Sequence, residues 1–73
     1  MGDKIIARRF GKILRAYRTK KGLTQEQLSE LAEMSVEHLQ RLEGKSPSGI
    51  RLETVVKLSK ALKTTPSALL KDL

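Results

Sequence analysis

The polar side chains of this sequence are spaced poorly for catalysis. The only histidine, His38, has neither cysteines nor a cluster of acids that could complete a metal site with it. Asp3 and Asp72 lie near opposite ends of the chain, and no Ser/His/Asp set or glycine-rich phosphate loop is present. We therefore expect no enzyme activity, no metal and no cofactor, and no small-molecule ligand is evident.

The charge pattern instead favours the binding of a polyanion. The net charge is +7, and it is uneven: residues 1–21 carry eight Lys or Arg against one acid, residues 22–44 one Arg against five Glu, and residues 45–73 six Lys or Arg against two acids. A basic frame around an acidic middle is typical of nucleic-acid binding. A basic surface that only keeps the protein soluble is the plainer alternative.

The size of the chain limits its architecture. We expect a single domain over residues 1–73, which buries only ~60% of the surface that the unfolded chain exposes. No cysteine is available for a disulfide, so stability must come from packing, with possible help from a second subunit. No apolar run approaches the ~20 residues of a membrane span, and the start lacks the apolar core of a signal peptide. We expect a cytoplasmic protein without membrane contact.

Apolar periodicity and capping residues predict an all-α fold with five helices. Gly22 is placed to end the first helix, Thr24 with Gln27 forms a capping-box pair, Ser35 can cap a third helix, and Thr65 can cap a fifth. The expected helices cover about 4–21, 25–32, 36–43, 52–62 and 66–72. Their inward residues include Ile6, Phe10, Ile13, Leu14, Tyr17, Leu28, Leu31, Ala32, Leu39, Leu42, Leu52, Val55, Leu58 and Leu62, and the fifth helix carries Leu69, Leu70 and Leu73.

The second and third helices are too close to lie antiparallel. Only about three residues, Glu33 to Ser35, separate them, so the turn forces the helices to cross steeply. This spacing predicts a helix-turn-helix, whose second helix enters the major groove of DNA.

The sequence "GLTQEQLSELAEMSVEHLQRLEGK", with "LETVVKLSKAL" and "TPSALL", resembles the lambda-repressor-like, Cro/CI-type (XRE) helix-turn-helix family from Phe10 to Leu70. Two residues depart from the family pattern: Ser29 stands where Ala is usual, and Glu33 where Gly is usual. If Glu33 keeps the left-handed backbone of that Gly, it is strained by ~1 kcal/mol. The loop from Glu43 to Thr54 is about one residue longer than is common.

The resemblance implies a DNA-contacting role for two sets of residues. The family's base-reading positions correspond to Val36, Glu37, Gln40 and Arg41, which can contact a thymine methyl, cytosine N4, adenine N6/N7 and guanine O6/N7 respectively. Its phosphate-binding positions correspond to Gln25, His38, Lys45, Ser46, Ser48 and Arg51. A solvent-exposed face and loop without DNA contact are the alternatives for both sets.

Arg18 and Glu43 are expected to form a structural ion pair. Glu43 would lie at a helix C-terminus, where a negative charge is unfavourable without a cation. Arg18 borders the apolar stripe of the first helix, and many family members pair an Arg and a Glu at these positions. Arg8, Lys12 and Arg15 form a basic face on the same helix, and we expect them to steer DNA rather than bind a membrane, because the apolar stripe is needed for the core.

We therefore expect a sequence-specific regulator of transcription, most simply a repressor, that binds double-stranded DNA. A single module makes few base contacts, so a homodimer on a palindromic operator is expected, with Val56, Thr64, Leu70 and Leu73 as interface candidates. The alternative is an antitoxin or phage-immunity-type protein whose main partner is another protein, held by the acidic stripe Glu26, Glu30 and Glu33.

Overall fold

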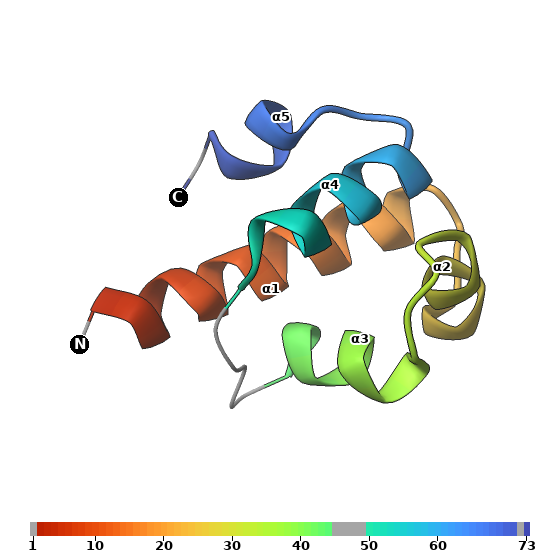
Figure 1. The fold of residues 1–73 in the computed structure, drawn as a ribbon, viewed down its shortest axis with the longest axis horizontal. Helices are drawn as coiled ribbons and strands as arrows, with labels where there is room; N and C mark the ends of the chain where they lie inside the picture. The colour runs from red at the N-terminus through yellow and green to blue at the C-terminus, as the bar shows by residue number, and fades with distance from the viewer. Residues whose placement is uncertain (1, 45–49, 72) are drawn as a thin grey trace.

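The computed structural model describes residues 2–44, 50–71 and 73, and all regular structure in them is helical (Figure 1). The helices are α1 (Gly2–Lys20), α2 (Gln25–Leu31), α3 (Val36–Glu43), α4 (Leu52–Ala61) and α5 (Pro66–Leu70). The predicted all-α fold class is thus confirmed. The helices begin and end within about two residues of the bounds expected from capping and periodicity.

Side-chain caps begin three of these helices. The Thr24 hydroxyl accepts a hydrogen bond from the backbone N–H of Gln27 at 3.0 Å, and the Gln27 side chain accepts one from the Thr24 N–H at 2.9 Å. The hydroxyls of Ser35 and Thr65 cap α3 and α5 by accepting hydrogen bonds from the backbone N–H groups of His38 and Ala68, each at 3.1 Å. Each cap satisfies N–H groups that have no partner inside the helix, so the start of each helix is set locally.

Three helices end in the same left-handed stop. Gly22, Glu33 and Lys63 follow α1, α2 and α4 with φ angles of 72°, 55° and 56°. The next residue donates its N–H back to a carbonyl five positions earlier: Leu23 to Arg18 at 3.1 Å, Met34 to Ser29 at 2.9 Å, and Thr64 to Ser59 at 2.8 Å. These are Schellman motifs, and two of them place a side chain where glycine is the favoured residue.

The core lies between helices α1 to α5, and each of them contributes to it. α1 packs against α3 and α5, α2 packs against α3 and α4, and α4 packs against α5. The buried core residues are Phe10, Leu14, Leu28, Ala32, Leu39, Leu42, Val55, Leu58, Leu62 and Leu69. Tyr17 is half-buried against this cluster, so both aromatic residues serve packing.

Gly11 permits the close approach of α1 and α3. A Cβ atom built on Gly11 would lie 2.3 Å from the backbone oxygen of Leu42, far inside van der Waals contact. A larger residue would push the two helices apart. The position of α3 against the body therefore depends on the missing side chain at this one position of α1.

Three residues expected to face inward are exposed, and in these cases the prediction is wrong. Ile6 is 46% exposed, because the start of α1 projects beyond the other helices (Figure 1). Leu31 and Leu52 are 58% and 73% exposed. Each lies about 90–105° around its helix from the centre of the buried face, at the border of the apolar stripe, where no neighbouring helix covers it.

Candidate nucleic-acid interface

The turn between α2 and α3 is short and sharply bent. α2 ends at Leu31 and α3 begins at Val36. The left-handed Glu33 reverses the chain between them, and Ser35 caps the new helix at once. The two helices cross steeply, so that α3 lies along one side of the molecule (Figure 1). This arrangement gives α3 one face against the core and one face toward solvent.

The solvent-facing side of α3 carries the side chains expected to read bases. Leu39 and Leu42 are 0% and 1% exposed and anchor the helix to the core. On the other side Glu37, Gln40 and Arg41 are exposed, and Val36 is half-buried. From Val36 to Arg41 the helix rises only about 7.5 Å. Side chains spread over that length fit within a major groove about 12 Å wide.

A partly buried ion pair fixes the end of α3 to α1. The Arg18 Nε donates to Glu43 Oε2 at 2.8 Å and its Nη2 donates to Oε1 at 3.0 Å, a bidentate pair. The side chains of Arg18 and Glu43 are only 12% and 3% exposed. The Arg18 Nη1 also donates to the Leu23 carbonyl at 2.8 Å, which ties the segment before α2 to the same guanidinium. The pair expected from the sequence thus connects three parts of the motif.

Gln25 extends this network to the start of α2. Its Nε2 donates to Glu43 Oε1 at 3.1 Å. A primary amide has two N–H groups, so this bond uses one of them. The side chain is therefore held in one orientation at the N-terminus of α2, where free backbone N–H groups favour an anion. The sequence predicted an anion-binding role for Gln25 but gave no indication of its bond to Glu43.

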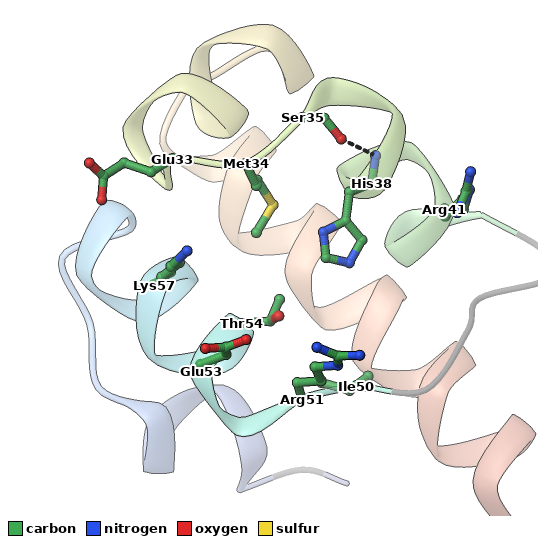
Figure 2. Close-up of a pocket in the computed structure, with 10 residues that line it drawn as sticks. All are labelled: Glu33, Met34, Ser35, His38, Arg41, Ile50, Arg51, Glu53, Thr54 and Lys57. Atoms are coloured by element: carbon green, nitrogen blue, oxygen red, sulfur yellow. Dashed lines mark hydrogen bonds between the residues drawn. The ribbon is translucent and has the colours of Figure 1, made fainter.

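A groove of about 730 Å³ runs between the start of α3 and α4 (Figure 2). His38 and Met34 point into it from above, and Arg51 and Thr54 point into it from α4 and its N-cap (Figure 2). His38 is half-buried there, while Arg51 is exposed. The residues that line it are Glu33, Met34, Ser35, His38, Arg41, Ile50, Arg51, Glu53, Thr54 and Lys57.

Comparison with known proteins identifies this arrangement. A family model described as Helix-turn-helix matches residues 14–69. The chain belongs to this family. The crystal structure of the restriction-modification controller protein C.AhdI from Aeromonas hydrophila is similar to it, with 33% identity and a TM-score of 0.81 over 86% of this chain and 94% of that chain. A search of curated proteins gave no match.

These findings confirm the resemblance to Cro/CI-type helix-turn-helix proteins and make the chain a DNA-binding transcription regulator. Within the described residues, no helix is long and apolar enough to cross a membrane. In the same part of the chain, no group of three or more His, Cys, Asp or Glu could hold a metal ion.

The helix-turn-helix brings together most of the predicted site residues, but not all of them can be placed. Gln25 is the first residue of α2, His38 lies in α3, and Arg51 is the N-cap of α4. Lys45, Ser46 and Ser48 fall outside the described residues. Sequence reasoning missed Lys57, which lines the groove in Figure 2 from the second turn of α4. No local pattern marks this lysine, because its place depends on how α4 packs beside α3.

Proposed function

We propose that this helix-turn-helix protein binds a specific palindromic operator as a homodimer and represses transcription from it. The observation that carries the proposal is the division of α3 into a face anchored by Leu39 and Leu42 and an exposed face with Glu37, Gln40 and Arg41. Only such a division lets the helix enter a major groove while the fold stays intact. Repression is the commoner outcome in the family that the sequence resembles.

In this proposal the base contacts come from the exposed face of α3. Arg41 binds guanine O6/N7, Gln40 binds adenine N6/N7, Glu37 accepts from cytosine N4, and Val36 contacts a thymine methyl. Each good bidentate contact discriminates against a wrong base by about 1–3 kcal/mol.

Phosphate contacts set the register of α3. Gln25 and the N-terminus of α2 hold one backbone strand, and its bond to Glu43 orients the amide before DNA arrives. His38 and Arg51 line the groove beside α3 and face phosphates on the other side. Lys45, Ser46 and Ser48, outside the described residues, keep their expected phosphate-binding role.

The homodimer is proposed to form over α4 and α5. Val56, Thr64 and Leu70 are half-buried in the single chain, and Leu73 is 37% exposed. Leu52 adds to this surface, since it is 73% exposed and lies four residues before Val56, on the same face of α4. A second copy that covers these apolar side chains would remove them from water and align two copies of α3 on one duplex.

Selection of bound duplexes from a random DNA pool tests the proposal. We expect a palindrome with half-sites about one helical turn apart. Arg41→Gln and Gln40→Ala should each relax preference at one position of each half-site, whereas Glu30→Gln, an exposed change on α2, should leave it intact. A single asymmetric half-site would count against the dimer, and unchanged preference in both α3 variants would count against base reading by this face.

A second candidate is a protein partner bound by α2. Glu26, Glu30 and Glu33 are all exposed, and Leu31 beside them is 58% exposed, which gives α2 an acidic surface with an apolar side chain. A partner with basic side chains would be attracted to this acidic surface, because complementary charge steers association. If α2 is the main interface, a Glu26→Gln/Glu30→Gln/Glu33→Gln variant loses its regulatory effect in cells while its affinity for the selected duplex is unchanged.

A further inference from the structure

A second groove runs along the basic face of α1. It has a volume of about 540 Å³ and is lined by Arg8, Lys12, Arg15, Glu43 and Gly44. The three cations occupy helical positions i, i+4 and i+7, so their side chains rise one above the other on one face of α1. The other side of the groove is formed by the end of α3, where Glu43 is the last helical residue and Gly44 is the C-cap.

The carboxylate in this groove is already engaged by groups outside the groove. Glu43 is 3% exposed and is already bound by the Arg18 guanidinium and the Gln25 amide. Lys12 and Arg15 are exposed. Like charges one turn apart on a helix repel, and an anion between them relieves that repulsion. The local electrostatics therefore favour a multiply charged anionic ligand.

The position of the groove relates it to the face of α3 described above. Gly44 follows Arg41 by three residues, so the groove begins where the base-reading face ends. From Arg8 to Arg15 the helix rises about 10 Å, so the three side chains are spread over a length that can span more than one phosphate of a strand. Arg8 and Lys12 precede residue 14, so two of the three cations lie outside the segment matched by the family model.

We propose that the groove of Arg8, Lys12 and Arg15 binds two or three consecutive phosphates of the DNA backbone just beyond the end of α3. The first half of α1 then lengthens the DNA contact and adds affinity that is independent of base sequence. The inference rests on the proposed docking of α3 in the major groove, because that docking carries the backbone to the groove.

A salt titration of binding to the selected duplex, with long flanks, tests this proposal. The test variant is Arg8→Gln/Lys12→Gln/Arg15→Gln. The matched control is Lys20→Gln/Lys60→Gln/Lys63→Gln, which removes the same charge from exposed lysines of other surface grooves. Each lost phosphate contact should lower the slope of log K against log salt by about 0.9, so we expect a fall of about 2–3 in the test variant and little change in the control.

Three further readouts separate the proposal from its alternatives. Trimming the flanks should weaken binding by the unaltered chain but not by the test variant. Base preference in the random-pool selection should be the same for both, since α3 is unchanged. If the α3 variants leave base preference unchanged while the test variant still shows a lower slope of log K against log salt, the proposed docking of α3 is wrong. In that case the groove binds phosphates in another register.

The proposal is overturned if the test and control variants lose the same slope, which would show only long-range attraction. It is also overturned if the unaltered chain binds vesicles of phosphatidylglycerol through this face more tightly than the duplex. Circular dichroism must show that the test variant is folded. The single variant Lys12→Gln, at an exposed position, should lower the slope by about 0.9 and gives the same decision if the triple variant does not fold.

Discussion

Removal of the Arg18 guanidinium should destabilise the fold more than any other single change on the surface of α1. In Arg18→Ala, the Glu43 side chain, which is 3% exposed, loses its cation, and among the described residues only Gln25 still donates to it. The Leu23 carbonyl also loses its donor. Breaking a buried ion pair from one side costs about 3–5 kcal/mol. We expect about 3 kcal/mol, because Arg18 is 12% exposed and the Gln25 bond to Glu43 remains.

Thermal unfolding followed by circular dichroism measures this loss. In a domain of this size, 1 kcal/mol shifts Tm by roughly 4–8 °C, so Arg18→Ala should lower Tm by roughly 12–24 °C. The control is Arg15→Ala, an exposed arginine of the same helix, which should change the free energy of unfolding by less than about 0.5 kcal/mol.

The double variant Arg18→Met/Glu43→Leu isolates the cause. With both charges gone and the volume retained, no uncompensated charge is buried, so stability should return to within about 1 kcal/mol of the unaltered chain. An Arg18→Ala variant with unchanged Tm would refute the clamp. A double variant as unstable as Arg18→Ala would show that the hydrogen bond from Arg18 to the Leu23 carbonyl, rather than the buried carboxylate, is responsible.

Four other changes have expected outcomes. Gly11→Ala should lower the free energy of unfolding by about 2 kcal/mol in urea, because strain of up to ~3 kcal/mol against the Leu42 carbonyl exceeds the ~1 kcal/mol gain in helix propensity. Unchanged stability would mean that α1 and α3 move apart without cost. Glu33→Gly should stabilise by about 0.5 kcal/mol, since relief of left-handed strain exceeds the entropy of the new glycine in the unfolded chain; a lower Tm would contradict this. Thr24→Ala should remove about 1 kcal/mol through loss of the capping box, and no loss would mean that water replaces the cap. Leu52→Ser should leave Tm unchanged at low protein concentration but abolish its rise with concentration, and a persistent rise would place the dimer interface elsewhere.

Much of the fold could be predicted because its helices begin and end through local chemistry. Thr24, Ser35 and Thr65 accept hydrogen bonds from residues three positions on, and Gly22 adopts the left-handed angle for which glycine is suited. These interactions span few residues, so they can be recognised in the sequence without knowledge of the tertiary structure.

The parts that could not be predicted depend on contacts between distant segments. Gly11 reads as a weak point in a helix until the Leu42 backbone is placed against it. Periodicity assigns Leu52 to the apolar stripe, but only the packing of the other helices decides which border of the stripe is covered. The bond from Gln25 to Glu43 joins residues 18 positions apart, and no local pattern records it.

The three left-handed stops have a consequence for the rate at which the chain reaches this fold. Each stop is closed by hydrogen bonds within six residues, so every reversal after α1, α2 and α4 can form before distant segments meet. Chains dominated by such short-range closures cross a low entropic barrier and fold in microseconds to milliseconds. The slowest event should then be the packing of α3 against α1 at Gly11. Refolding measured by stopped flow should be slower in a variant with a larger residue at this position.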